Sequence, residues 1–394
     1  MIRRVVVLLA GLAVLLGCGG GDAVKIGAVL PLSGEWSIYG QPIKNGIDLA
    51  YKELTEGGDF PYEIELVIAD SESDPAIGKE RLAELYGDGA AAVIGGATSA
   101  EALQMVPVAD QYDRVLLSPS ASNPELTGIS KNFYRVFLSD AREGTTMASF
   151  AYGKLGIKSA VILSKEEAYA KGIQVVFAKE FERQGGEVLD MIEFPANPDV
   201  SGLVERVMTV SPEAVYIAAY APDIASLLTA LRSAGYEKYI FTTSAFAAPA
   251  VIEQQGQAAE GVFLTQSVFE PESEDPLVRG FVETYRAAYG VPPDLYAAHG
   301  YDSMLILAET LRKSGPIASD FWKGITSIRE FAGVTGMIQF DERGDVQKFP
   351  HVYVVEEGNL IDYEAEVEKR RRELLERLRE LERRQRQKAL GGSG

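Results

Sequence analysis

The sequence predicts an α/β fold of two doubly wound parallel-sheet lobes, joined by three crossover segments and followed by a C-terminal helix. First, nearly continuous apolar runs alternate with amphipathic helical patterns, as is typical of parallel strands covered on both faces. Second, this alternation runs through the chain twice, from Val24 and again after Asp140. Third, 394 residues, 46% of them hydrophobic, are enough for two ordinary cores.

The first series consists of short apolar strands separated by helices. Thr98 and Glu101 have the spacing of a capping box, which indicates that a helix begins at Ser99. The strands are expected at 24–31, 63–70, 91–96, 115–119 and 132–137, and the helices at Ile43–Leu54, Ala76–Tyr86 and Ser99–Tyr112.

The second series repeats the pattern, and a helix-rich part follows it. Its strands are expected at 159–164, 187–194, 214–220 and 239–243, and its helices at Gly144–Leu155, Tyr169–Gln184, Ser201–Val210 and Ile224–Ala234. The later part is expected to hold helices at Pro276–Tyr289, Leu295–Leu311 and Phe321–Ile328, and strands at 336–340 and 351–358.

The last two strands must complete one or both lobes, so the chain is expected to cross between the lobes more than once. We expect crossovers near Asp140, Ser267 and Phe349. The N-terminal lobe then comprises 24–140 and 268–348, and the C-terminal lobe 141–267 and 349–362.

Residues 1–17 are predicted to form a lipoprotein signal peptide. The basic start "MIRR" precedes an apolar run that is too short for a comfortable membrane span. The run ends in "LLGC", which resembles the bacterial lipobox, in which the cysteine is lipidated. Cys18 is the only cysteine, so we expect the lipid there, with "GGGDA" as a short flexible link to the membrane. The chain is thus expected in the cell envelope as a membrane-anchored lipoprotein, facing the periplasm or the cell exterior.

The tail differs from the rest of the chain. Residues 363–390 predict a basic amphipathic helix, with 10 Lys/Arg against 7 Asp/Glu between Glu364 and Leu390, and residues 391–394 a disordered end. Val367, Leu374, Leu378 and Leu381 have heptad-like spacing. This pattern is typical of a solvated terminal helix, of a weakly self-associating coil, or of a helix that contacts anionic lipid.

Composition and motifs exclude several functions. The formal net charge of −19 argues against binding nucleic acid, which needs a large basic surface. The chain has no G-x-S-x-G elbow, Walker loop or H-E-x-x-H motif. Its only histidines, His299 and His351, lack neighbouring ligand types, so we expect no metal site, no cofactor and no enzyme.

Five stretches carry a resemblance to a known family: "IGAVLPLSGEWSIYGQPIKNGIDLA", "AVIGGATSAEAL", "LLSPSASNPELT", "FYRVFLSDAREG" and "YIAAYAPDIASLLTALRSAGY". The chain from about Val24 to Asp362 resembles the substrate-binding proteins of bacterial ABC transporters, in the leucine/isoleucine/valine-binding family. The resemblance implies two lobes that close on a ligand by a hinge. It further implies delivery of the ligand, an amino acid or a related small carboxylate, to an ABC permease. A receptor component that senses amides, urea or carboxylates with the same fold is the alternative.

Three serines are expected to receive the ligand carboxylate. Hydroxyls where a strand meets a helix can either cap the helix or, with the free N–H groups there, bind an anion. The resemblance implies the second role for Ser99, together with the backbone of Ser120 and the hydroxyl of Ser122.

Four tyrosines are expected around the same ligand. The resemblance implies that Tyr220 helps to hold the ammonium group from the other lobe. It also implies that Tyr39 and Tyr169 form walls of the pocket, and that Tyr296 contacts the ligand near its side chain.

One position departs from the family pattern. Where the family has a glutamate that pairs with the α-ammonium, this chain has Ala245, with Phe246 beside it. A buried ammonium without a counter-charge is costly. Either another acid reaches the site, with Asp140 and Asp302 as candidates, or the ligand has no ammonium and is a small aromatic or branched carboxylate that Phe246 also contacts.

Overall fold

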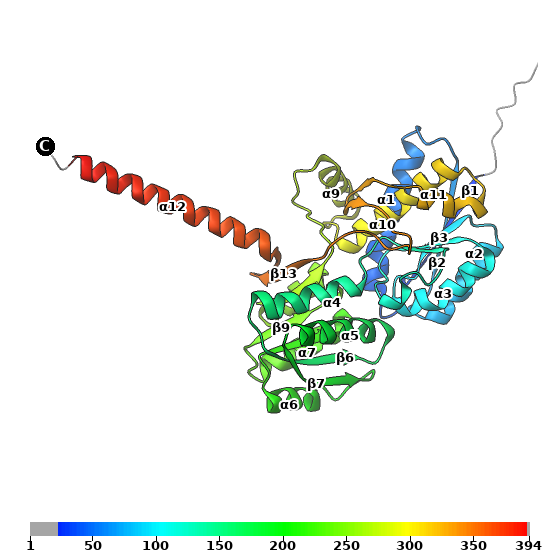
Figure 1. Ribbon diagram of the computed structural model, residues 1–394. Coiled ribbons are helices and arrows are strands. Elements are labelled where there is room, and N and C mark those ends of the chain that lie inside the picture. The colour runs from blue at the N-terminus through cyan, green and yellow to red at the C-terminus, as the bar shows by residue number, and fades with distance from the viewer. Residues whose placement is uncertain (1–22, 392–394) are drawn as a thin grey trace, which may run out of the picture.

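The computed structural model describes residues 23–391, and the side chains of residues 23–385. The predicted signal peptide, Cys18 and residues 392–394 lie outside this range. Figure 1 shows two α/β lobes and a long helix that projects away from them.

The first lobe is built on a parallel sheet in the order β2-β1-β3-β4-β5. Apolar side chains cover both of its faces, as the continuous apolar strands predict. Its strands are β1 (Val24–Leu30), β2 (Ile64–Asp70), β3 (Ala92–Gly95), β4 (Val115–Ser118) and β5 (Phe133–Arg135), and its first helices are α1 (Ser37–Glu56), α2 (Pro75–Gly87) and α3 (Ser99–Tyr112).

The second lobe is built on a larger sheet in the order β14-β13-β10-β9-β8-β6-β7, again with an apolar core on each face. Its strands are β6 (Ser159–Lys165), β7 (Glu187–Phe194), β8 (Ala214–Ala218), β9 (Tyr239–Thr242), β10 (Val262–Gln266), β13 (His351–Glu356) and β14 (Asn359–Asp362). Its helices are α4 (Asp140–Ser149), continued by a π-helical turn at Phe150–Lys154, α5 (Ala168–Arg183), α6 (Val200–Val210), α7 (Ala221–Ser233) and α8 (Pro249–Gln255).

Three further helices and a small hairpin join the core of the first lobe. They are α9 (Pro276–Tyr289), α10 (Leu295–Ser314), α11 (Phe321–Thr326) and the pair β11 (Phe331–Gly333) and β12 (Gly336–Ile338). Helices α1 and α10 pack backbone to backbone: a Cβ added at Gly46 would lie 2.0 Å from the carbonyl oxygen of Ala297, and one at Gly300 2.2 Å from that of Ile43. This close packing places Tyr39 and Tyr296 side by side.

The chain passes between the lobes three times, between β5 and β6, between β10 and α9, and between β12 and β13. The predicted fold class is therefore confirmed. The second sheet is mixed rather than wholly parallel, since β13 and β14 are antiparallel to their neighbours. A tight turn at Glu357 and Gly358, both with positive φ, joins these two strands as a hairpin.

Helix α12 (Tyr363–Gly391) leaves the second lobe and extends away from it (Figure 1). Its base is held by ion pairs of Lys154 with Glu364 at 3.0 Å and of Arg370 with Glu356 at 2.6 Å. Its leucines Leu374, Leu375, Leu378 and Leu381 are exposed. Across residues 23–391, no helix combines the length and the apolar character needed to cross a membrane.

Candidate functional site

An enclosed cavity between the lobes brings together seven of the eight residues predicted to contact the ligand. It measures about 20 Å³, which is room for about one water molecule. It is lined by Tyr39, Ala97, Ser99, Ser120, Ser122, Phe137, Tyr169, Tyr220, Ser244, Ala245 and Tyr296.

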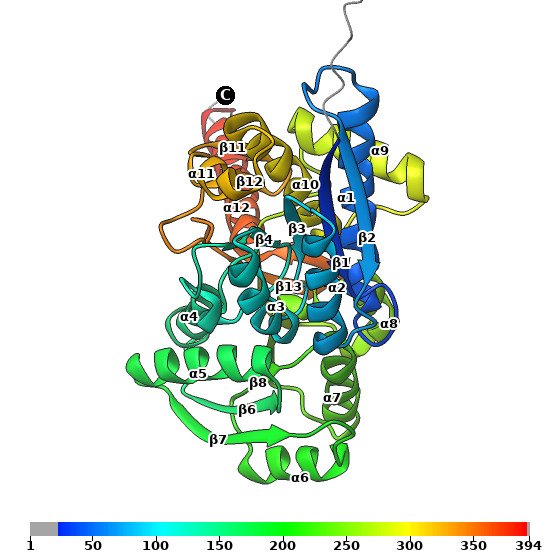
Figure 2. The same cartoon turned by 90° about the vertical axis from the view of Figure 1, so that its right-hand side faces the viewer.

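The parallel strands explain why these residues meet. Ser99 follows β3, Ser120 follows β4, Tyr169 follows β6, Tyr220 follows β8 and Ser244 follows β9. All five thus lie at the carboxyl ends of strands, the edge at which open α/β sheets bind ligands. Figure 2 shows the two lobes one above the other, and the cavity lies where the residues after these strand ends meet.

The start of α3 is capped as the sequence predicts. The hydroxyl of Thr98 accepts from the N–H of Glu101 at 3.2 Å, and the Glu101 carboxylate accepts from the N–H of Thr98 at 3.1 Å. Gly96, with φ +67, turns the chain from β3 into this cap. Because Thr98 supplies the cap, Ser99 is free for another role, and its Oγ accepts from the N–H of Asn123 at 3.2 Å.

The loop after β4 carries the other two serines. The hydroxyl of Ser120 donates to the carbonyl oxygen of Ala97 at 2.7 Å, which ties this loop to the segment before α3. The carbonyl oxygen of Ser122 accepts from the N–H of Asp140 at 2.8 Å. Ser99, Ser120 and Ser122 therefore line the same cavity, each held by a hydrogen bond to the backbone.

Tyr39 joins the two lobes across the cavity. Its hydroxyl accepts from the N–H of Ala221, at the start of α7, at 2.9 Å and donates to the carbonyl oxygen of Ala245 at 3.1 Å. The hydroxyl of Tyr296 donates to the carbonyl oxygen of Ser244 at 3.2 Å. All three bonds run between the first lobe and the second, so the structure shows the lobes closed on each other.

The tyrosines also stack on one another. The rings of Tyr169 and Tyr220 lie 4.8 Å apart at 22°, Tyr39 lies 4.8 Å from Tyr296, and Trp36 lies 4.4 Å from Tyr220. Burial raises the pKa of all four tyrosine hydroxyls, so they stay neutral and act as hydrogen-bond donors or acceptors.

The two residues at the position of the family's glutamate face different ways. Ala245 lines the cavity. Phe246 is fully buried in the hydrophobic core of the second lobe and is absent from the lining, so the structure gives it no contact with the cavity.

The two acids considered as a replacement for that glutamate lie in different places. Asp302 is buried in the first lobe, where its carboxylate accepts from the N–H groups of Val334 and Thr335, both at 2.9 Å. It is committed to that loop and is not at the cavity. Asp140 is fully buried at the start of α4, directly behind Ser122.

Three further residues line the cavity that were not predicted from the sequence. Ala97 and Ser244 contribute from turns that follow strands, and Phe137 contributes from the crossover after β5. Ser244 could have been predicted, because it is a hydroxyl residue that follows shortly after a buried strand, as Ser99 is.

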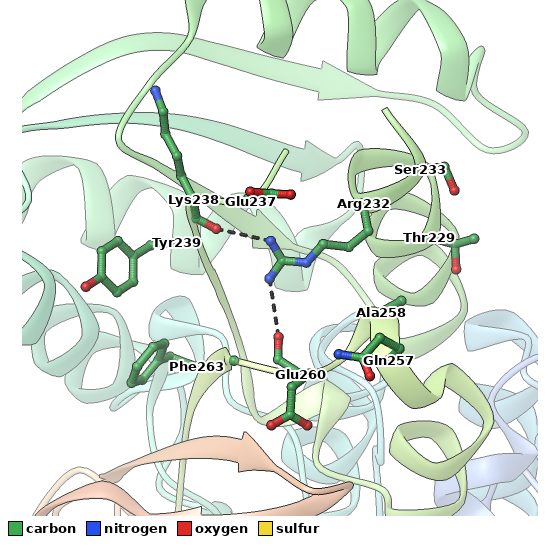
Figure 3. A pocket seen from close by; sticks show the side chains of 11 residues that line it. Thr229, Arg232, Ser233, Glu237, Lys238, Tyr239, Gln257, Ala258, Glu260 and Phe263 are labelled. Atoms are coloured by element: carbon green, nitrogen blue, oxygen red, sulfur yellow. Dashed lines mark hydrogen bonds between the residues drawn. The ribbon is translucent and has the colours of Figure 1, made fainter. Parts of the chain in front are cut away.

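A larger open hollow of about 870 Å³ lies elsewhere on the second lobe (Figure 3). It is at the amino-terminal ends of β9 and β10, on the edge away from the cavity. Arg232 crosses it, but its guanidinium donates to the carbonyl oxygens of Tyr236, Lys238 and Glu260. This arginine therefore holds loops together and offers little to a ligand.

In the described part of the chain, His, Cys, Asp and Glu residues form no group of three that could hold a metal ion. The cavity instead offers hydroxyls, the start of α3 at Ser99, and aromatic walls. Such a set suits a small anion with an apolar part.

Two hinged α/β lobes around an enclosed polar and aromatic cavity define a solute-binding protein. The profile described as periplasmic binding protein matches residues 23–357, so the chain belongs to this family, within its leucine/isoleucine/valine-binding branch. Members are the extracytoplasmic, non-enzymatic binding components of ABC transporters. The predicted resemblance is confirmed.

Individual relatives agree along most of the chain. The leucine-, isoleucine-, valine-, threonine- and alanine-binding protein of Pseudomonas aeruginosa is 23% identical over 332 residues, which is 83% of this chain and 88% of the relative. A leucine-binding protein of Thermotoga maritima has a solved structure that is 31% identical, with a TM-score of 0.81, and the match covers 86% of this chain and 97% of that one. A substrate-binding protein of Desulfitobacterium hafniense in complex with Leu is 26% identical, with a TM-score of 0.74, over 86% and 99%.

Proposed function

We propose that this chain captures an amino acid or a related small carboxylate between its lobes and delivers it to an ABC permease. The observation that carries the proposal is the joint cavity: seven residues predicted to contact a ligand come from both lobes and line one enclosed space. The relatives named above, whose names state leucine or other amino acids, support this ligand class.

The carboxylate is assigned to the first lobe. Ser99 stands at the start of α3, where the partial positive charge of the helix and its free N–H groups favour an anion. Ser120 and Ser122 lie beside it. Tyr169 and Tyr220 then contact the ligand from the second lobe, and their contacts favour the closed state.

Entry of the ligand requires movement. A cavity of about 20 Å³ is far smaller than the roughly 300 Å³ or more of a typical ligand pocket. The lobes must therefore part, breaking the bonds of Tyr39 and Tyr296, and close again around the ligand.

The same proposal includes membrane anchoring, docking on the permease and self-association. Lipidation of Cys18 would hold the protein at the membrane that contains the permease, and closing of the lobes would create the surface that the permease recognises. Exposed apolar residues on α12 support weak self-association through that helix.

A thermal-shift panel of amino acids, matching carboxylic acids and amides tests the binding function. Ligand at a hundred times its dissociation constant adds about 2.7 kcal/mol to the free energy of unfolding, or a few degrees in melting temperature. We expect an amino acid or a carboxylate to raise the melting temperature. A shift with amides alone would contradict the proposal and favour the sensing alternative, and no shift with any compound would overturn it.

A further inference from the structure

Two acids, Asp140 and Glu143, lie one layer behind the cavity on the first turn of α4. Both side chains are fully buried. The Ser122 hydroxyl faces Asp140, and the Ser244 hydroxyl faces Glu143. Because Ser122 and Ser244 both line the cavity, the two carboxyl groups stand directly behind its polar wall.

The charge of these acids has no dedicated partner. Arg135, whose charge acts on Asp140, is bidentate to Asp345 at 2.7 and 3.1 Å, and its remaining N–H groups donate to Asn123, Thr127 and Ala121. Within residues 23–385, both oxygens of Asp140 and one of Glu143 have no hydrogen-bond partner. A buried carboxylate left in this state is costly, so the site favours a positive charge from outside the chain.

A second observation points into the cavity itself. Tyr169 lines the cavity, and its hydroxyl is buried and lacks a hydrogen-bond partner among the described residues. This hydroxyl lies close enough to Asp140 and Glu143 for their charge to raise its pKa. A lining residue thus carries an unpartnered polar group on the side of the cavity where the acids gather.

Glu167 is a useful comparison, because it is also a largely buried acid near the cavity tyrosines. Lys165 lowers its pKa and bonds Asp223 at 2.6 Å, but burial outweighs this and raises the pKa of Glu167 to about 7. Unlike the α4 pair, Glu167 has no cavity serine among the groups that shift its pKa.

We propose that Asp140 and Glu143 act, through Ser122 and Ser244, as the counter-charge for a protonated amine on the ligand. The inference rests on the proposed function and names its ligand class: an α-amino acid in preference to the matching carboxylic acid. The acids on α4 then do the work of the glutamate that is absent at Ala245.

The proposal links binding to proton release. Burial raises the pKa of Asp140 to about 7 and that of Glu143 above its usual value. Three other titratable groups face the pair. Arg135 from β5 is paired with Asp345. Tyr169 from α5 and Tyr216 from β8 have raised pKa values and therefore stay neutral. Near neutral pH the pair holds protons, and an arriving ammonium ionises it and releases protons to solvent.

Calorimetric titrations with leucine and with isocaproate, its analogue without the amine, test the inference. We expect the unaltered protein to prefer leucine, and to release protons when titrated in buffers of different ionisation enthalpy. Asp140→Asn and Glu143→Gln should weaken leucine binding about thirtyfold or more, leave isocaproate unchanged or tighter, and reduce proton release. Glu167→Gln is the matched control and should keep the preference.

The outcomes separate this inference from the proposed function. Failure of the whole thermal-shift panel would overturn the proposed function. Equal binding of leucine and isocaproate, or equal losses of both in the variants, would overturn the counter-charge alone. If a variant fails to fold, the unaltered protein still tests the inference through its preference for leucine over isocaproate and its proton release. Leucine binding without proton release would contradict the inference.

Discussion

At the scale of single residues, Ser99 lies directly after the capping residue Thr98 and next to a contact between the lobes. Its hydroxyl accepts from the N–H of Asn123, whose side chain reaches across to the carbonyl oxygen of Ala168 on the second lobe at 2.6 Å. Ser99 therefore lies between the proposed carboxylate position and a contact that closes the lobes.

Ser99→Ala should weaken binding of the best ligand of the thermal-shift panel by roughly ten- to a hundredfold. A hydrogen bond to a carboxylate contributes on the order of 1.5–3 kcal/mol, which sets this range. Calorimetry measures the change. Ser303→Ala is the matched control, because Ser303 is equally buried but donates to the carbonyl oxygen of His299, away from the cavity. An unchanged dissociation constant in Ser99→Ala would remove this serine from the site.

Tyr39→Phe should open the ligand-free protein. The change removes two bonds between the lobes and leaves the buried N–H of Ala221 without a partner, at a cost of about 1–3 kcal/mol. Small-angle scattering should show a larger radius of gyration. Tyr285→Phe is the control, since that hydroxyl bonds Asn45 within the first lobe. Identical scattering of the Tyr39 variant and the unaltered protein would refute the role of this bond in closure.

How much of the site the sequence could predict depends on the residue. Ser99, Ser120 and Ser122 follow strands whose end is visible in the sequence, so their position at a common edge can be predicted. Phe246 could not be placed, because Ala245 and Phe246 lie in a single turn of 3-10 helix at Ser244–Phe246. Consecutive side chains there point in different directions, and only the three-dimensional packing decides which one meets the cavity.

At the scale of elements, helix boundaries were predicted best where the sequence contains an explicit capping motif. Helix α3 begins at Ser99 as predicted, because its capping box is explicit in the sequence. Helix α1 begins at Ser37, six residues before the predicted start at Ile43, and it contains Pro42 in its second turn. Strand β10 was missed, because the helix that follows it, α9, lies across a crossover in the other lobe and does not complete a strand–helix unit of the same sheet.

Helix α12 is expected to associate with a second copy of itself as a parallel pair. Its apolar positions Leu374, Leu378 and Leu381 are exposed and follow heptad spacing. In a parallel pair Arg377 faces Glu382 of the other helix, whereas an antiparallel pair brings arginines together.

Leu378→Gln combined with Leu381→Gln should therefore lower the association constant of the protein. Analytical ultracentrifugation over a range of concentrations measures it, and Leu277→Gln is a control because this leucine is also exposed but lies on α9 in the first lobe. If the unaltered protein stays monomeric at every concentration and binds vesicles of anionic lipid instead, the lipid alternative holds and self-association is wrong.

At the scale of the whole molecule, burial of acids around the interlobe region sets the dependence of stability on pH. Burial raises the pKa of Asp140 and Glu167 to about 7, and that of Asp294 to about 6. The folded protein then binds more protons than the unfolded chain from about pH 4 up to these values, so the free energy of unfolding falls as pH rises through this window. His299 acts in the opposite sense: burial lowers its pKa from 6.5 to about 3, so its contribution is lost as pH falls below 6.5.

The three buried carboxyl groups outweigh His299, so we predict that the ligand-free protein is more stable at pH 5 than at pH 8. The net charge of −19 adds self-repulsion in the same direction. We expect a melting temperature several degrees higher at pH 5 in calorimetric scans, since 1 kcal/mol corresponds to about 2–4 °C for domains of this size. Glu167→Gln should narrow the difference, because glutamine stays neutral at both pH values and removes the cost of ionising this buried group. A higher melting temperature at pH 8, or a difference that the variant leaves unchanged, would show that these acids are solvated in the folded protein and that the lobes close less tightly in solution.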